Sequence, residues 1–312
     1  MHRFAIGPTP CAADGGAGPR QAGRLARVAA GLPSRPVVGI LHPGAMGASI
    51  GAALKARAGQ VIWAAAGRSD QTSKRAELAD LVAVRDVDEL VRCADVVISL
   101  CPPAAALDLA ADVASFGRPA LYVDANAIAV ETVTEIERLF GTDRVVDAAI
   151  IGPPAWRPDS TVFWAAGEQA DTVAELFGGS AVDARVLGKR LGSASALKAC
   201  FALQSKAMPA LWFTLAAAAR EYGVDDAVRS ELGRDGIDLD MELDRITQRA
   251  AAKAWRWSGE MDEAAKVLRA IGLPDGFSSS AAEVYRRVAA VVGKAGGPES
   301  ATAVEAVRRP EG

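Results

Sequence analysis

The segment from Val37 to Ser69 limits the fold of this chain more than any other part of the sequence. It opens with short apolar residues at 37–41, which suit a strand buried on both faces of a parallel sheet. A helical pattern follows over 48–57, and a second apolar run follows over 61–65. Two buried strands joined by one helix form a β-α-β unit, so we predict that a parallel sheet begins here.

Two glycines lie in the turn before that helix. Gly44 and Gly47 occupy two of the three glycine positions of the GxGxxG pattern, where one glycine lets the backbone approach a pyrophosphate and another lets helix and strand pack closely. The first glycine is replaced by His42, which Pro43 follows. The helix start would present unpaired N–H groups and the positive end of its dipole to the phosphates. We predict a dinucleotide site made by His42, Pro43, Gly44, Ala45, Met46 and Gly47; the alternative is an α/β unit whose glycines serve packing alone.

The end of the second predicted strand indicates which dinucleotide is bound. NAD enzymes carry an acidic side chain here, which accepts hydrogen bonds from the ribose hydroxyls. This chain has Arg68 and Ser69 instead, with Lys74 and Arg75 close behind. A guanidinium and a hydroxyl suit the 2′-phosphate of NADP, so we predict that Arg68 and Ser69 bind NADP. The alternatives are a solvated, basic helix start or, because Asp70 is near, NAD.

Composition excludes several classes of protein. The 312 residues are half apolar, enough for two domains with large cores. The net charge is −3 and the basic residues are scattered, so we predict no nucleic-acid partner. No uncharged apolar run is long enough to cross a membrane.

Histidine and cysteine are too sparse for metal or triad chemistry. The only histidines are His2 and His42, and the four cysteines lack the spacing of metal ligands. We therefore predict no metal site and no histidine-activated nucleophile. Cysteines in apolar segments without a secretory signal favour a reducing, cytoplasmic location.

Strand and helix patterns alternate as far as residue 187. Strands are predicted over 81–84, 95–100, 120–123, 145–151, 161–166 and 181–187, and helices over 86–93, 104–114, 130–140 and 170–177. Helices of this length between strands imply right-handed crossovers. We predict an α/β fold, with a Rossmann-type, doubly wound and mainly parallel sheet over 36–190.

From Gly192 onward the signals are almost all helical. We predict an all-helical substrate and dimerisation domain over 191–293, whose first helix runs over 193–222 with a kink at Pro209. The apolar surface of that helix suggests a homodimer. A Gly-, Ala- and Pro-rich segment at 1–35 is predicted to be a disordered leader, or the result of a start codon placed too far upstream, and 294–312 a flexible tail.

Three loops leave the predicted carboxyl edge of the sheet, where ligands bind in such folds. The first contains Cys101 and Pro102, the second contains Asn126, and the third starts at Ile151, Gly152 and Pro153. We place Cys101, Pro102 and Asn126 near the nicotinamide; the alternative for each loop is ordinary turn chemistry.

Lys198 lies in the opening turns of the helix that follows Gly192, among small apolar residues. The helix dipole disfavours a positive charge there, and burial would lower the lysine pKa further. We predict that Lys198 exchanges a proton near neutral pH; the alternative is a solvated surface lysine.

These motifs resemble those of the β-hydroxyacid dehydrogenase and 6-phosphogluconate dehydrogenase superfamily, particularly a branch with a distinctive helical C-terminal domain. The resemblance covers residues 37–292. It rests on HPGAMG at 42–47, DAAIIGPP at 147–154, the segment 192–198, AWRWSGEM at 254–261 and GLPDGFSSSAAEVYRR at 272–287. It implies that Lys198 is the catalytic acid/base, that 147–154 contacts the substrate, and that the helical domain closes the site and forms a dimer.

The sequence departs from that pattern in two places. Many superfamily members have an asparagine one turn after the lysine, where this chain has Phe201 and Ala202, so we expect Gln204 or Ser205 to replace it. The substrate loop is less glycine-rich, because it contains Ile151 and Pro153.

Three functions remain open at this point. The first is NADP-dependent hydride transfer to or from a small hydroxy or keto compound, with Lys198 handling the proton. The second is reduction of a C=N group on the same fold. The third is binding of NADP without catalysis.

Overall fold

The computed structural model describes residues 31–117, 119–250, 253–292 and 299–308. The predicted leader lies outside this range, except for 31–35. The chain divides into two compact units, Met1–Lys198 and Ala199–Gly312, which we call unit 1 and unit 2. No helix of the described part is long and apolar enough to cross a membrane.

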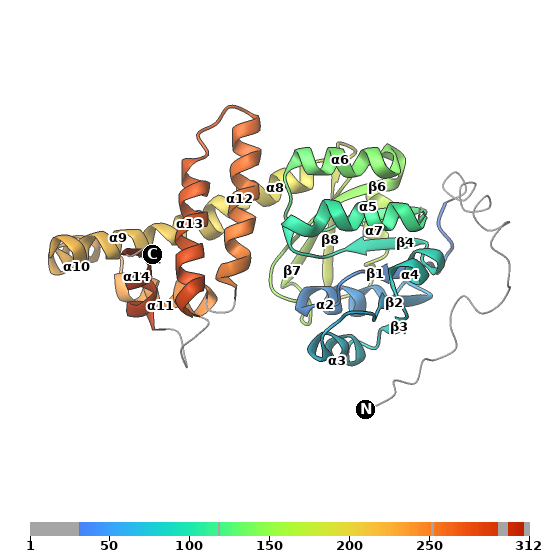
Figure 1. The fold of residues 1–312 in the computed structure, drawn as a ribbon, viewed down its shortest axis with the longest axis horizontal. Coiled ribbons are helices and arrows are strands. Elements are labelled where there is room, and N and C mark those ends of the chain that lie inside the picture. The colour runs from blue at the N-terminus through green and yellow to red at the C-terminus, as the bar shows by residue number, and fades with distance from the viewer. Residues whose placement is uncertain (1–30, 118, 251–252, 293–298, 309–312) are drawn as a thin grey trace. The chain divides into compact units, whose positions relative to one another are not determined.

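Unit 1 contains an eight-stranded sheet (Figure 1). Its order is β3-β2-β1-β4-β5-β6-β7-β8, and only the pair β6 and β7 is antiparallel. The strands are β1 (Val37–Ile40), β2 (Gln60–Ala64), β3 (Val82–Val84), β4 (Val96–Ser99), β5 (Leu121–Asp124), β6 (Val145–Ile151), β7 (Thr161–Ala166) and β8 (Val182–Gly188). The chain changes direction across the sheet between β1 and β4, where doubly wound folds bind ligands.

Helices cover both faces of the sheet (Figure 1). One apolar core joins the sheet to α2 (Ala45–Leu54), α3 (Asp70–Leu78) and α7 (Ala170–Glu175). The other joins it to α4 (Val87–Cys93), α5 (Ala106–Phe116), which follows a 3-10 turn at Pro103–Ala105, and α6 (Val130–Phe140). In β1, β2, β4 and β5, successive apolar side chains alternate between the two cores, as the strand period requires. The predicted doubly wound, mainly parallel sheet is confirmed.

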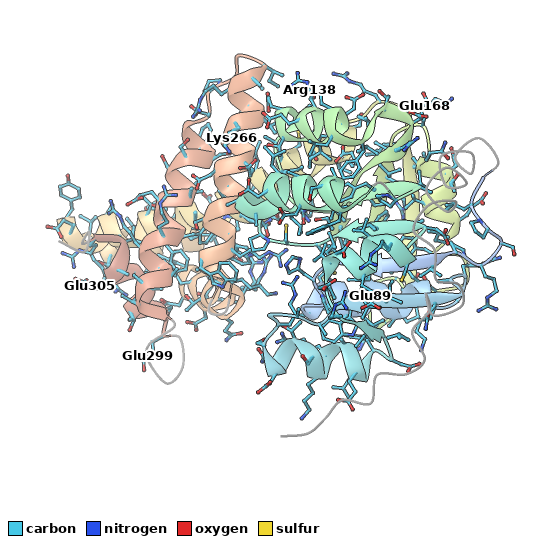
Figure 2. The ribbon with its side chains drawn as sticks, turned by 45° about the vertical axis from the view of Figure 1, so that its right-hand side comes forward. Glu89, Arg138, Glu168, Lys266, Glu299 and Glu305 are labelled. Atoms are coloured by element: carbon cyan, nitrogen blue, oxygen red, sulfur yellow. The ribbon has the colours of Figure 1, made fainter. Side chains whose placement is uncertain are left out.

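Charged side chains lie on the outside of unit 1. Arg138 of α6 and Glu168, which follows β7, are both exposed (Figure 2). Their exposure agrees with a surface that solvates charge while the strands bury apolar residues.

Unit 2 is helical in its described residues. It contains α9 (Met208–Tyr222), α10 (Asp225–Arg234), α11 (Leu239–Ala250), α12 (Ala254–Ala270), α13 (Gly276–Val292) and α14 (Ser300–Arg308). Figure 1 shows α12 and α13 side by side as a hairpin. Phe213, Met261, Tyr285 and Val304 are fully buried in its core.

The predicted helix over 193–222 has the predicted bounds, but it is not one regular α-helix. The structure has α8 (Ser193–Ala202), a π turn at Leu203–Ala207, and then α9. Pro209 lies in the first turn of α9. Proline cannot donate to the carbonyl four residues before it and its ring crowds that carbonyl, so the wider turn relieves the clash that we expected to kink the helix.

The predicted flexible tail is also wrong in part, because Ser300–Arg308 forms α14. Ala303, Val304 and Val307 are buried on one side of this helix. Their spacing of one and three residues places them on one face of a helix, and burying that face holds the segment in place.

Candidate functional site

The turn between β1 and α2 has the shape of a phosphate-binding loop. A side chain at Gly47 would place its Cβ 2.1 Å from the carbonyl oxygen of His42, so only glycine fits there. At Gly44 an added Cβ would meet no atom within 4 Å. Gly44 is the N-cap of α2, with φ −65°. The N–H groups of Ala45 and Met46 therefore open onto free space at the positive end of the helix.

His42 and Arg68 lie beside this turn. Arg68 Nη2 donates to the carbonyl oxygen of Leu41 at 3.2 Å, while Arg68 Nε and His42 Nδ1 are buried atoms without a hydrogen-bond partner. Burial, and then the nearby Arg68 charge, lower the pKa of His42 to about 4, so the imidazole is neutral at pH 7. Burial also lowers the pKa of Arg68. Two buried nitrogens without partners fit a loop that completes its hydrogen bonds with a ligand.

Ser69 is the N-cap of α3 in the structure. Its Oγ accepts a hydrogen bond from Thr72 N at 3.3 Å, so it caps α3. Lys74 and Arg75 belong to α3, but the first turn of this helix carries Asp70 and Arg75 lies in its last turn, so α3 does not have the basic start of the alternative. The roles of Arg68 and Ser69 at a 2′-phosphate stay predictions.

Asn126 fixes the loop after β4. Its Oδ1 accepts from Cys101 N at 2.5 Å, and its Nδ2 donates to Ser99 Oγ at 3.0 Å and to Asp124 Oδ2 at 2.9 Å. The backbone N–H of Asn126 also donates to Asp124 Oδ1, at 3.0 Å. Because its side chain is buried in these bonds, Asn126 can act on a cofactor by positioning Cys101 and Pro102.

Burial raises the pKa of two titratable groups at this edge. Burial raises the pKa of Asp124 to about 7, although the hydrogen bonds from Asn126 oppose the shift. Burial, together with the Asp124 carboxylate, raises the pKa of the Cys101 thiol to about 12. Cys101 is thus a protonated, weakly reactive thiol, and we give it no nucleophilic role.

Lys198 lies against the end of β6. Its ammonium donates to the carbonyl oxygen of Ile150. Strand β5 ends at Asp124, whose register partner on β6 is Asp147. Strand β6 continues to Ile151, so Ile150 lies beyond the end of β5. The solvated surface alternative does not describe Lys198, which is part-buried and bound to the main chain.

Sequence reasoning missed Asp147, which binds the start of α8, the helix that carries Lys198. Asp147, fully buried in β6, accepts hydrogen bonds from the main chain at the start of α8 and from Ser195 Oγ. Burial raises the pKa of Asp147, and the donors around it oppose the shift. The signal was an isolated acidic residue in an otherwise apolar strand.

The predicted substrate loop is fastened to unit 1 by two hydrogen bonds near its C-terminal end. Thr161 Oγ1 donates to the carbonyl oxygen of Pro153 at 2.6 Å, and Ser49 Oγ of α2 accepts from Ala155 N at 2.9 Å. Gly152 has φ +130°, and a Cβ there would lie 2.3 Å from the carbonyl oxygen of Ser160. Gly152 is therefore required by close chain packing.

Gln204 and Ser205 belong to the π turn of unit 2. Gln204 is exposed, and Ser205 Oγ donates to the carbonyl oxygen of Phe201 at 2.8 Å. The next residue, Lys206, pairs with buried Glu260 at 3.0 Å, and Tyr285 Oη donates to the Lys206 carbonyl oxygen at 2.8 Å. The turn is thus held by two residues of the predicted C-terminal signature, while the roles of Gln204 and Ser205 with substrate stay predictions.

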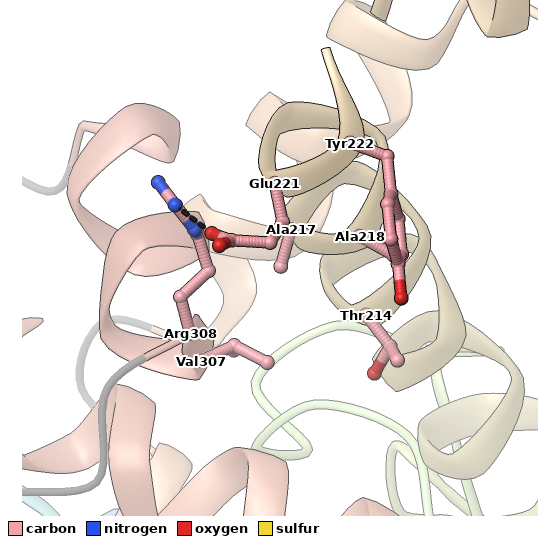
Figure 3. A pocket seen from close by; sticks show the side chains of 7 residues that line it. All are labelled: Thr214, Ala217, Ala218, Glu221, Tyr222, Val307 and Arg308. Atoms are coloured by element: carbon pink, nitrogen blue, oxygen red, sulfur yellow. Dashed lines mark hydrogen bonds and ion pairs between the residues drawn. The ribbon is translucent and has the colours of Figure 1, made fainter. Parts of the chain in front are cut away.

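Unit 2 also has a pocket of about 490 Å³. An ion pair between Arg308 and Glu221 borders it, and Tyr222 projects beside it (Figure 3). No predicted site residue lines this pocket, so we assign it no part in the site.

The geometry of unit 1 fits a dinucleotide. An added Cβ at Gly44 would meet no atom within 4 Å, so the turn before α2 is open on that side, and Arg68 is bonded to the adjoining Leu41 carbonyl. The loops after β4, β5 and β6 follow along the same edge of the sheet. A helix start that can bind an anion, at α2, and a hydrogen-bond donor, the Lys198 ammonium, are the two chemical features of this edge.

Two sequence comparisons match parts of the chain. A domain of unknown function, DUF1932, matches residues 219–288. An uncharacterised 28.5 kDa protein of Methanothermus fervidus is 29% identical over 177 residues, which are 55% of this chain and 68% of that protein.

Solved structures show the same fold. A conserved protein of unknown function, described as similar to 3-hydroxyacid dehydrogenases, matches 83% of this chain and 100% of its own with a TM-score of 0.58 and 26% identity. The 3-hydroxyisobutyrate dehydrogenase of Mycobacterium tuberculosis, solved with L-serine, matches 88% of this chain and 100% of its own with a TM-score of 0.61 and 19% identity. Psf3, solved with NADP+, matches 86% of this chain and 99% of its own with a TM-score of 0.57 and 17% identity.

Proposed function

From the 3-hydroxyacid dehydrogenase fold of this chain, with its C-terminal DUF1932 domain, we propose that the protein is an NADP-dependent oxidoreductase acting on a small hydroxy or keto compound. The observation that carries the proposal is the glycine turn before α2: an added Cβ at Gly44 would meet no atom within 4 Å, and Arg68 is held next to the turn by its hydrogen bond to the Leu41 carbonyl. A phosphate is the group that such a helix start and guanidinium bind best.

Each group of the site then has a task. Bound NADPH would supply a hydride. The Lys198 ammonium would donate a hydrogen bond to the substrate oxygen and a proton to the alkoxide that forms; in the reverse direction the neutral amine would accept the hydroxyl proton. Lys198 donates to the Ile150 carbonyl oxygen, so a substrate oxygen would replace that carbonyl as the acceptor.

One observation favours reduction of a C=N group as a second candidate. Pro153 and Pro154 have no N–H, and the N–H of Ala155 is bonded to Ser49. The loop beside Lys198 therefore offers few main-chain donors for a carboxylate, and a substrate without one fits it better. Turnover of cyclic imines without turnover of hydroxy acids would select this candidate.

The first experiment is a titration of the protein with NADPH and with NADH, followed by nicotinamide fluorescence. We expect tighter binding of NADPH, and we expect Arg68→Ala to remove that preference. Lys74→Ala, which removes an exposed positive charge from α3, is the matched control and should bind like the wild type. Equal binding of both nucleotides would refute the NADP assignment, and no binding of either would refute the dehydrogenase function.

We also propose a homodimer formed by unit 2. Several large apolar side chains of that unit are exposed: Met241, Trp255, Ile271, Leu273 and Phe277. A contiguous patch of such side chains would be typical of a protein interface, and we propose that they meet a second copy of the chain. Sedimentation equilibrium measures the mass; a monomer at micromolar concentration would refute the dimer.

A further inference from the structure

A buried carboxylate connects the sheet to the helix that carries Lys198. Asp147 of β6 has no exposed surface, and its register partner on β5 is the other buried acid, Asp124. Burying a carboxylate costs free energy unless hydrogen bonds compensate for the lost water. The contacts of Asp147 therefore show what this acid is for.

All its described hydrogen-bond partners are donors at the start of α8. Asp147 Oδ2 accepts from Ala194 N at 2.9 Å and from Ser195 N at 3.0 Å, and Asp147 Oδ1 accepts from Ser195 Oγ at 2.6 Å. Both oxygens accept hydrogen bonds, which is the pattern of an ionised carboxylate. A carboxylate on unpaired N–H groups at the positive end of a helix is a strong anchor.

The approach of α8 to the sheet depends on Gly192. Its φ is +84°, and a Cβ there would lie 2.6 Å from Val130 Cγ1 of α6. The chain therefore turns tightly before α8, which directs the first N–H groups of the helix toward Asp147.

The same strand holds Lys198 by a second contact. Asp147 binds the first turn of α8, and three residues along β6 the Ile150 carbonyl accepts from the Lys198 ammonium, one turn further along the helix. Two fixed points on one strand thus define where the ammonium lies. Hydride and proton transfer tolerate little displacement of the acid/base, since a misplacement of about 1 Å can cost about 100-fold in rate.

We propose that Asp147 is a positioning residue for Lys198: its carboxylate anchors the start of α8 to β6 and so holds the Lys198 ammonium at the end of that strand. The catalytic part of this inference rests on the proposed function, in which Lys198 transfers the proton. The positional part concerns only the folded protein and can be tested without a substrate.

The positional test is NMR of the protein after reductive methylation of its lysines with ¹³C-formaldehyde. Loss of one signal in Lys198→Ala assigns Lys198, and exposed Lys74 serves as the reference. We expect the Lys198 signal to stand apart from that of Lys74 in the wild type and to move to the Lys74 position in Asp147→Asn. Ser195→Ala removes one donor and keeps the carboxylate, so it should cause a partial move; it carries the test if Asp147→Asn does not fold.

Asp95→Asn is the matched control. Asp95 is also a buried aspartate that accepts a main-chain hydrogen bond, from Val37 N at 3.0 Å, but it precedes β4 at the opposite edge of the sheet. We expect its substitution to leave the Lys198 signal in place. An unchanged Lys198 signal in folded Asp147→Asn, or an equal change in Asp95→Asn, would overturn the proposal.

The catalytic test is a double-mutant cycle on turnover. Asp147→Asn should lower kcat about 10- to 100-fold without changing NADPH binding, and it should have no further effect on kcat when Lys198 is already alanine. The same loss in both backgrounds would show that Asp147 acts independently of Lys198. A wild-type protein that turns over no hydroxy acid, ketone or imine would instead refute the proposed function, and the NMR result would still decide the role of Asp147.

Discussion

Gly44 and Gly47 lie three residues apart in one turn, and the structure gives alanine opposite consequences at the two positions. At Gly44 the added methyl group meets no atom within 4 Å, and φ is −65°, which alanine adopts freely. Alanine loses less conformational entropy on folding than glycine but is a poorer N-cap, and each effect is about 1 kcal/mol or less. We therefore expect Gly44→Ala to change the free energy of unfolding by about 1 kcal/mol at most.

The effect of Gly44→Ala on cofactor binding should be large. Its methyl group fills the space that we assign to the pyrophosphate, so the phosphate must move away from the N–H groups of α2. A tenfold loss of affinity corresponds to about 1.4 kcal/mol, less than the value of one charge-assisted hydrogen bond, and we expect at least that loss.

Gly47→Ala should instead lower both the free energy of unfolding and the affinity for NADPH. Its Cβ would lie 2.1 Å from the His42 carbonyl oxygen, so the turn must move by about 1 Å to reach normal contact. Overpacking of this kind costs about 1 to 3 kcal/mol of stability. Urea unfolding and NADPH titration of the three proteins measure both quantities. NADPH binding by Gly44→Ala as tight as by the wild type would refute the assignment of the phosphate to this helix.

Three further perturbations test other parts of the molecule. Lys198→Ala should lower turnover by about 10² to 10⁴-fold and leave NADPH affinity unchanged; unchanged turnover in steady-state assays would contradict the acid/base role. The pKa of Asp124 is about 7 in the folded protein and 3.8 unfolded, so its stabilising contribution is complete below pH 3.8 and is lost as pH rises through 7. Urea unfolding should therefore show that the free energy of unfolding falls less between pH 5.5 and pH 8 in Asp124→Asn than in the wild type. An equal fall in both proteins would argue against a raised pKa of buried Asp124. Glu260→Gln should destabilise the protein by about 3 kcal/mol, because Lys206 keeps a nearly buried charge without its partner, whereas Tyr285→Phe should cost about 1 kcal/mol. Thermal unfolding checks the order of the last two.

The sheet could be predicted because its strands are short apolar runs bounded by turn residues. The segments 130–140, 145–151 and 161–166 have the bounds that their patterns predicted, since each is set by local periodicity. The predicted helix over 48–57 begins and ends three residues too late, because Gly47, a poor helix former, lies inside the helix rather than in the turn before it.

The site could be predicted only as a set of loops. That Lys198 and the β6 loop come together follows from the order of strands and helices. The contacts of Asp147 with Ser195 and of Asn126 with Cys101 join residues 48 and 25 positions apart, and no local pattern marks them. Buried polar networks depend on which segments meet in three dimensions, so they become visible only in the structure.

The π turn at Leu203–Ala207 changes how this chain must be aligned with others. A π turn contains one residue more than an α turn, and each residue of a helix advances the direction of the side chain by about 100°. Beyond the turn, a residue-by-residue alignment with a relative whose helix is uninterrupted would pair side chains from different faces. A one-residue gap at 203–207 restores the match. Any search for the residue that replaces the asparagine after Lys198 should therefore compare faces of the helix rather than positions in the sequence.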